Sequence, residues 1–511
     1  MSNTCVSSGP RGHWGIWGSD RDAGRRTSRT YSWFGLLLVV PLISASMMSC
    51  ASNLATGERH LNLISESQEI EIGREADAQV IATIGLYPDS ALQRYVQELG
   101  SRIARDSERP NLPWTFRVVD DPTVNAFAVP GGFIYVTRGL VAYMMNEAEL
   151  ASVIGHEIGH VTAKHSVYRM SEQQVTQIGV TAGMMIKPSL QKYGDYLNAG
   201  LGLLYLKFSR DDESQADHLG LRYMIRTGYD PREMIDVFDM LSRVSEAGGA
   251  GRLPEWLATH PNPENRSGHI QAEIDTLTID MGALSVNQNG YLRLLDGVVF
   301  GDDPRLGFFK DNHFYHPEFE FEFLFPLSWQ TANLRDGVVA VSDKQEAVIQ
   351  ITMAQATSAA EAARAFFQQE GLEGERQEVT TINDLSSVSA QFRAQDGEQS
   401  LRGRATFVDL EGKTYQLLGY TTEQLWSKYE SITTSALRSF RRLTDPAILR
   451  MQPMRLTILT VTQRVSLEQL AQQENSPVLL GTLALINQTE TNAQFNAGDR
   501  VKIVKGDGTA Y

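Results

Sequence analysis

The sequence predicts an α+β chain of several domains: a mainly helical domain with a small β-sheet, then an α+β domain, then a small βααβ module. Its 511 residues correspond to roughly two to five domains. Apolar residues mostly follow helical spacing up to about residue 300 and form alternating, strand-like runs after it. Hydrophobic residues make up 42% and charged residues 21%, as in ordinary folded proteins. The expected segments are residues 1–49, 50–300, 301–445 and 453–506.

The N-terminal segment has the pattern of a bacterial lipoprotein signal peptide. Arginines precede an apolar run at residues 33–43, and small or soft residues lead from it to Cys50. The alternative is an uncleaved membrane anchor, but this run is shorter than the roughly 20 residues of a spanning helix. We therefore expect residues 1–49 to be removed and Cys50 to carry lipid. Ala51, not Asp, follows the cysteine, and by resemblance to lipoprotein sorting this implies the outer membrane over the inner one. The protein is therefore expected in the periplasm of a Gram-negative-type bacterium.

The charge balance limits the class of partner. There are 46 basic and 61 acidic residues, giving a net charge of -15. Such a chain repels phosphate backbones, which argues against nucleic acid as a partner. The two cysteines are Cys5, in the segment expected to be removed, and Cys50, so the mature chain is expected to have no disulfide.

The first domain is predicted to begin with helices and continue into a small sheet. Residues 66–107 have the apolar spacing of two helices, and residues 114–119 and 133–136 form short β-type runs bounded by turn residues. Asn146 is placed to cap the next helix, whose first turn is acidic. This helix is expected to run toward His165.

Two apolar segments and one loop complete the first domain. Residues 175–186 and 197–208 are each too short to cross a bilayer, so they are buried helices or a lipid-touching hairpin, and we favour burial. Glycine and proline punctuate residues 247–263, which predicts a loop able to cover an active site.

The C-terminal part of the chain has a different pattern. Residues 319–323 alternate strictly, residues 405–420 form a predicted hairpin, and residues 425–440 a closing helix. No charged cluster of this α+β domain has a catalytic pattern. Residues 454–505 are then predicted as strand, helix, helix and strand.

The residues that point to chemistry lie in the motif Gly-His-Glu-Ile-Gly-His at residues 155–160. His156 and His160 are four residues apart on one helical face, where two imidazoles can bind one zinc ion. Glu157 lies beside them, placed to take a proton from water at the metal. The alternative is a coincidental surface helix. The apolar neighbours disfavour it, because a bare histidine pair among them would be costly.

A catalytic zinc needs a third protein ligand and an open position. Glu213 and Asp217 lie four residues apart on a later predicted helix, so Glu213 is the candidate ligand and Asp217 a hydrogen-bond acceptor for a ligand imidazole. A solvated acidic helix start is the alternative for this pair. Two other histidines compete as ligands. His165 is expected to face elsewhere, and His218 is one residue off the Asp217 face.

These motifs together resemble the zinc metalloendopeptidase family that includes HtpX and the CAAX prenyl proteases, and within it the periplasmic BepA-like branch. The resemblance covers about residues 61–270 and includes residues 125–132 and the Thr-His-Pro of 259–261 with Arg266. It implies a gluzincin fold with one Zn2+ per chain. The implied ligands are His156, His160 and Glu213, with Glu157 as general base and acid.

Two further motifs have a physical interpretation. Asn125, Ala126, Phe127 and Ala128 are expected to form an edge strand that holds an extended substrate by main-chain hydrogen bonds. The alternative is an ordinary turn before a strand.

His260 is expected to act in catalysis, by stabilising the tetrahedral oxyanion, or to occupy the open zinc position in a resting state. Alternatively, His260 and Arg266 only tie the loop to acidic neighbours such as Asp217.

After residue 300 the chain departs from the BepA-like pattern. Residues 301–445 resemble the PsbP-like fold and residues 453–506 the LysM module, which suggests contact with peptidoglycan or a structural cap. The predicted function is cleavage of misfolded or stalled envelope proteins by a zinc endopeptidase anchored to the outer membrane by lipid. The alternatives are a peptidase acting on peptidoglycan and a chaperone or scaffold whose zinc site is closed.

Overall fold

The computed structural model describes residues 53–60, 62–172, 208–247, 256, 260, 266–396 and 399–507. The chain divides into two units, residues 1–49 and 50–511, and every described residue lies in the second. The predicted signal peptide, Cys50, residues 175–186 and all but the last residue of 197–208 lie outside the described residues. Of the predicted loop at 247–263, only Ala247, Trp256 and His260 are described. Within the described ranges, no helix combines the length and apolarity needed to cross a membrane.

The first domain opens with the two predicted helices, α2 (Glu66–Thr83) and α3 (Ser90–Arg105). Ser65 begins α2 through a capping box, and the Asp89 carboxylate accepts two backbone N–H groups at the start of α3. A three-stranded sheet follows in the order β1-β3-β2, with β1 parallel and β2 antiparallel to β3. Its strands are β1 (Thr115–Val119), β2 (Ala126–Val129) and β3 (Phe133–Thr137).

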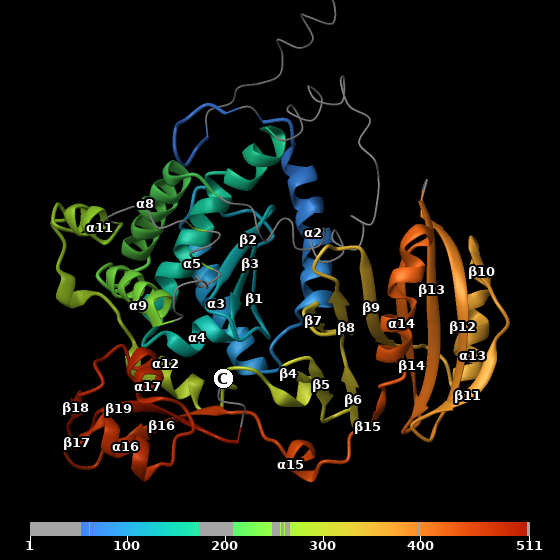
Figure 1. The fold of residues 1–511 in the computed structure, drawn as a ribbon. Helices are drawn as coiled ribbons and strands as arrows, with labels where there is room; N and C mark the ends of the chain where they lie inside the picture. The colour runs from blue at the N-terminus through green and yellow to red at the C-terminus, as the bar shows by residue number, and fades with distance from the viewer. Residues whose placement is uncertain are drawn as a thin grey trace, which may run out of the picture. The chain divides into compact units, whose positions relative to one another are not determined.

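Helix α5 (Glu147–Thr162) is the centre of this domain. Asn146 caps it as predicted, and all of its residues are buried. It packs between the sheet and two later helices, α8 (Arg210–Arg226) and α9 (Glu233–Ala247) (Figure 1). The remaining helices of this region include α4 (Arg138–Tyr143), α11 (Arg266–Ile274) and α12 (Gln288–Leu295).

The predicted α+β domain contains a twisted antiparallel sheet of eight strands. Helix α13 (Ala359–Phe367) and helix α14 (Trp426–Leu437) belong to two different apolar clusters, formed by side chains that alternate along the strands and so cover opposite faces. The strands are β7 (Gln330–Leu334), β8 (Gly337–Val341), β9 (Ala347–Met353), β10 (Leu372–Gly374), β11 (Glu378–Ile382), β12 (Leu385–Asp396), β13 (Gln399–Leu410) and β14 (Lys413–Thr422).

A second, four-stranded sheet belongs to the same domain. Its order is β15-β6-β5-β4, and its aromatic side chains join the apolar cluster that contains α14. The strands are β4 (Phe308–Lys310), β5 (His313–His316), β6 (Phe321–Leu324) and β15 (Arg441–Arg442).

The C-terminal module has the predicted strand, helix, helix, strand order: β16 (Arg455–Thr460), α16 (Leu467–Gln473), α17 (Leu480–Ile486) and β19 (Arg500–Lys505). β16 and β19 pair antiparallel. Its apolar residues belong to the same core cluster as those of the first domain. The mixed α+β multidomain prediction is therefore confirmed.

Candidate metal centre

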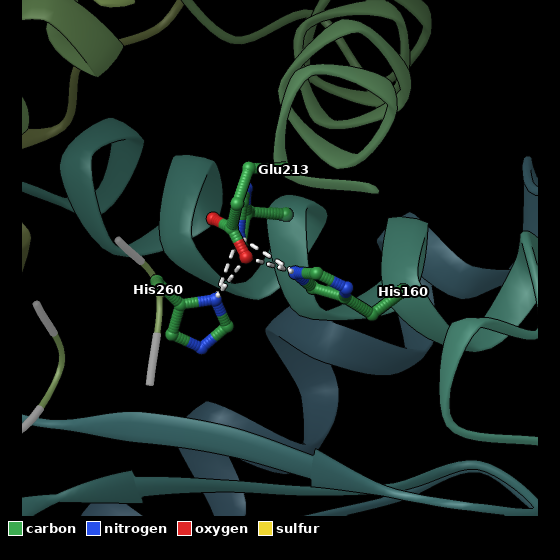
Figure 2. A group of neighbouring side chains, drawn as sticks. His160, Glu213 and His260 are labelled. Atoms are coloured by element: carbon green, nitrogen blue, oxygen red, sulfur yellow. Dashed lines mark hydrogen bonds and ion pairs between the residues drawn. The ribbon is translucent and has the colours of Figure 1, made fainter. Parts of the chain in front are cut away.

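Four buried side chains converge between α5, α8 and the loop before α11. They are His156, His160, Glu213 and His260, and one ligand atom from each lies within 4.8 Å of all the others. The two Nε2 atoms of His156 and His160 are 3.0 Å apart. Figure 2 shows His160, Glu213 and His260 pointing toward one another from three different segments of the chain.

Glu213 faces both histidines of the motif. Its Oε1 atom lies 3.5 Å from His160 Nε2, and its Oε2 atom lies 3.5 Å from His156 Nε2. Oε2 is buried and accepts no hydrogen bond within the described part of the chain. Two imidazoles and one carboxylate are a donor set that zinc prefers, so the residues present fit a zinc ion.

Close contact between two helices brings Glu213 to this position. A Cβ atom added at Gly159 of α5 would lie 2.9 Å from the carbonyl oxygen of Ala216 in α8. One added at Gly220 of α8 would lie 2.9 Å from the backbone nitrogen of His156. These glycines let the backbones of α5 and α8 approach each other with no side chain between them. Gly159 is recognisable in the sequence as part of the histidine motif. Nothing in the sequence indicates that Gly220 of α8 lies against the same helix.

Asp217 and Arg266 support the centre from behind. Asp217 Oδ1 lies 2.8 Å from Nδ1 of His156, as the sequence predicts for an outer carboxylate. Arg266 donates from Nε to Asp217 Oδ2 at 2.7 Å, and all three side chains are buried. Arg266 therefore makes the contact with Asp217 that the alternative interpretation of this residue expects.

His165 is not one of the four clustered residues, as expected, but it lies closer to them than its position in the sequence suggests. Its Nδ1 atom lies 2.9 Å from Nδ1 of His160, on the side of the ring that faces away from the cluster. The prediction that His165 faces elsewhere assumed a continuous helix. Instead α5 ends at Thr162, and Lys164 adopts a φ of 61°, which turns the chain back toward His160. His218 does lie apart from the centre, with a half-exposed side chain beside Glu273.

His260 is placed in the cluster itself. Its Nδ1 atom lies 3.0 Å from Glu213 Oε1 and 3.4 Å from His156 Nε2, and its Nε2 atom lies 3.5 Å from Glu157 Oε1. The indole of Trp256 stacks on the imidazole of His260 at 4.9 Å, and the Arg266 guanidinium lies 4.9 Å from the same indole. Trp256 could not be recognised from the sequence, because a single aromatic residue belongs to no distinctive motif.

The protonation states suit a metal centre. Burial lowers the pKa of His160 well below its ordinary value, which favours the neutral imidazole that a metal requires. Burial alone would raise the pKa of Glu213, but nearby His260, His156 and Arg266 lower it on balance and favour the carboxylate. Burial raises the pKa of Glu157, so this group holds a proton more readily than an exposed glutamate does.

Strand β2 forms the edge of the small sheet, as predicted; it includes Ala126, Phe127 and Ala128 and begins just after Asn125. The Thr137 N–H donates to the Asn125 carbonyl at 3.0 Å, so this pair is hydrogen-bonded. In an antiparallel ladder hydrogen-bonded pairs alternate with non-bonded pairs, so the backbone groups of Ala126 and Ala128 point away from β3. The strands of this sheet pass below the cluster in Figure 2.

Comparison with known proteins supports a metalloendopeptidase. Residues 90–274 match the model of Peptidase family M48. The beta-barrel assembly-enhancing protease of Yersinia pestis is 32% identical over 211 residues, which cover 40% of this chain and 43% of the relative. The Escherichia coli K12 protein of that name is 31% identical over 213 residues, with the same coverage. The mitochondrial metalloendopeptidase OMA1 of Schizosaccharomyces pombe is 30% identical, over 42% of this chain and 64% of the relative.

The family match at residues 90–274 lies within the first domain. The chain spans less than half the length of the two bacterial relatives. They confirm the prediction of a metalloendopeptidase and its similarity to M48 peptidases. A solution structure of cyanobacterial PsbP from Synechocystis covers 25% of this chain at 16% identity with a TM-score of 0.22, a likeness too weak to support an argument. The PsbP-like and LysM-like assignments stay predictions.

Proposed function

We propose that this protein is a zinc-dependent endopeptidase of the bacterial cell envelope that cleaves misfolded or stalled envelope proteins. The observation that carries the proposal is the buried cluster of His156, His160, Glu213 and His260, whose ligand atoms lie within 4.8 Å of one another. The match to M48 peptidases and the similarity to proteases named for β-barrel assembly support it.

In this proposal His156, His160 and Glu213 hold the zinc ion. Bound zinc supplies Lewis-acid chemistry, which polarises a peptide carbonyl and acidifies water. Glu157 accepts a proton from the attacking water and returns it to the leaving nitrogen, so that the C–N bond breaks and a carboxylic acid and an amine form. Its burial and its place beside the ligands suit a group that holds this proton in mid-reaction.

The peptide substrate is proposed to lie along β2. The outward backbone groups of Ala126 and Ala128 would pair with an extended chain, while Asn125 and Phe127 continue the same edge. Recognition through the main chain needs no particular side chain. This suits unfolded proteins of varied sequence as substrates.

The envelope location rests on the sequence of the N-terminal segment. We propose that Cys50 carries lipid and anchors the protein to the outer membrane. Peptidoglycan is proposed as a further contact on the LysM-like resemblance alone.

The position of His260 favours a second candidate function. A histidine within hydrogen-bond reach of Glu213 would give the metal four protein ligands, as in closed structural sites. The protein would then act as a chaperone or scaffold with no need for Glu157.

The test compares zinc content and casein cleavage of purified residues 51–511 in four forms. These are the wild type, Glu157→Gln, His260→Ala and, as a control, His218→Ala, whose side chain is 57% exposed. We expect about one zinc per chain in all forms. Cleavage should be lost in Glu157→Gln, raised in His260→Ala, and unchanged in the control.

Zinc without cleavage in any form would favour the closed-site scaffold. Release of muropeptides from purified cell wall, without casein cleavage, would favour a peptidoglycan peptidase. A chain without zinc would refute the site assignment.

A further inference from the structure

The first described residue, Asn53, is fixed to the end of the helix that carries the histidine motif. Its Nδ2 group donates to the Ala163 carbonyl at 2.8 Å and lies 3.3 Å from the Thr162 carbonyl, and its side chain is buried. Its Oδ1 atom accepts from Ala55 N at 2.7 Å, which closes a local turn. Helix-end carbonyls lack partners within the helix, so Asn53 caps α5 from a site far away in the sequence.

The residues after Asn53 also contact the helices around the histidine motif. Gln215 of α8 donates to Glu58 at 2.9 Å, the His60 ring stacks on Tyr168 at 4.6 Å, and Leu63 N donates to Ser171 Oγ at 3.2 Å. The segment is therefore held both on α8, which carries Glu213, and on the chain that follows α5.

Because Asn53 is bonded to the end of α5, only a short segment connects Cys50 to the first domain. Asn53 lies three positions after Cys50 with two residues between them, and a fully extended chain over three positions spans at most about 10 Å. Ala163 follows His160 by three residues, a rise of about 4.5 Å along a helix. A lipid on Cys50 would thus be joined by a very short tether to the part of the protein that holds the metal centre.

An apolar side chain faces outward at the same place. Leu54 is 83% exposed and lies in the turn that Asn53 closes. An exposed leucine is ordinary by itself. Four positions after a cysteine proposed to carry lipid, however, it gives the turn an apolar group that gains free energy by entering a bilayer interface.

We propose that the turn at residues 53–58 rests on the membrane that holds the Cys50 lipid, with Leu54 in the interface, so that the enzyme cleaves peptide segments close to that membrane. The partner is a lipid surface, and the inference rests on the proposed lipidation and endopeptidase function. A lipoprotein with a long linker would reach far into its compartment. Here the first domain is attached to the chain only three positions after Cys50, so it would stay close to the membrane.

Contact with the bilayer is tested without any measurement of activity. The mature chain has no free cysteine once Cys50 carries lipid, so Leu54→Cys can be labelled with an environment-sensitive dye in the full lipidated protein. Val379→Cys, at a residue 84% exposed on β11, is the matched control. In vesicles of phosphatidylethanolamine and phosphatidylglycerol we expect a blue shift and quenching by nitroxide lipids at position 54 and neither at 379. Equal signals at the two positions would overturn the proposal.

The reach is tested by lengthening the tether. A Gly-Ser insertion of about 20 residues between Ser52 and Asn53 adds a mean span of roughly 25 Å. On vesicles carrying an unfolded peptide anchored close to the bilayer, we expect the insertion to lower the cleavage rate several-fold, because the effective concentration falls. Casein cleavage in solution should not change.

The failures of this test can be told apart. Equal cleavage of the anchored peptide by both forms would overturn the proposed reach. No casein cleavage by either form would refute the endopeptidase function, and an unlipidated Cys50 in mass spectrometry would refute the anchor on which this inference rests.

Discussion

Nδ1 of His156 lies 2.8 Å from Oδ1 of Asp217, and both side chains are buried in the first domain. Arg266 holds the other oxygen of the carboxylate at 2.7 Å. Burial alone would raise the pKa of Asp217, but the charge of Arg266 and the bond to His156 lower it on balance. The imidazole is thereby held in the orientation that presents Nε2 to the cluster.

Asp217→Asn is therefore expected to weaken zinc binding by about 10- to 100-fold, because the amide is a poorer acceptor for the ligand imidazole. The measurement is competition with a zinc chelator of known affinity. Asp211→Asn, at an exposed position in the first turn of the same helix, is the control and should bind zinc as the wild type does. Equal affinities of all three proteins would show that Asp217 does not orient His156.

The helix contact behind Glu213 gives a second prediction. Gly159→Ala places a methyl group against the Ala216 backbone, so α8 must move away from α5 by part of an ångström or more. We expect lower zinc affinity and a loss of stability of about 1–3 kcal/mol. Gly481→Ala in α17 has open space around it and should be neutral or slightly stabilising. Thermal unfolding and zinc titration of both variants decide between these outcomes.

Much of the first domain can be predicted from sequence, because its features are local. The His156 and His160 spacing, the Asn146 cap and the α2 and α3 periodicities each depend on a few neighbouring residues. The Asp217 contact was predictable as well, since helix geometry places it one turn beyond Glu213.

Contacts between residues far apart in the sequence could not be predicted from local patterns. His165 approaches His160 only because Lys164 turns the chain back, and no propensity of lysine predicts a positive φ. Asn53 caps α5 across more than a hundred residues, and Lys502 enters the first domain from the last strand. Sequence spacing contains no information about such pairs.

The outward backbone of β2 gives a third prediction. Ala128→Pro removes an N–H group that points away from β3, so the sheet should persist while main-chain binding of substrate weakens. We expect a higher KM for an unfolded peptide with zinc content unchanged. Phe127→Pro removes a group that pairs with β3 and should instead destabilise the domain. If Ala128→Pro cleaves with an unaltered KM, substrate does not pair with this edge.

The last prediction concerns the join between the C-terminal module and α5. The ammonium of Lys502, on β19, is fully buried and donates to the carbonyls of Ala142 at 2.9 Å and Met144 at 2.6 Å. Glu149 of α5 is also buried and accepts from Gln488 of the module at 2.8 Å. Burial raises the pKa of Glu149 to about 8 and lowers that of Lys502 to about 7.

Lys502→Met isolates the effect of Glu149. A carboxyl whose folded-state pKa lies above its unfolded value of 4.5 stabilises the fold fully below that value, and this contribution is lost as the pH rises through about 8. Removal of the Lys502 charge raises the pKa further, and Glu233 acts in the same direction. We therefore expect the stability of Lys502→Met to fall between about pH 5 and pH 8, with a limiting slope of about 1.4 kcal/mol per pH unit.

The matched control is the double variant Lys502→Met with Glu149→Gln, which contains neither charge. Both variants keep the histidine cluster and all other titrating groups, so the difference between their denaturant unfolding curves isolates Glu149 across the pH range. A stability difference that is constant with pH would mean that Glu149 is not desolvated in the folded protein. A difference that changes as expected would establish that Glu149 takes up a proton in its buried position beside Gln488.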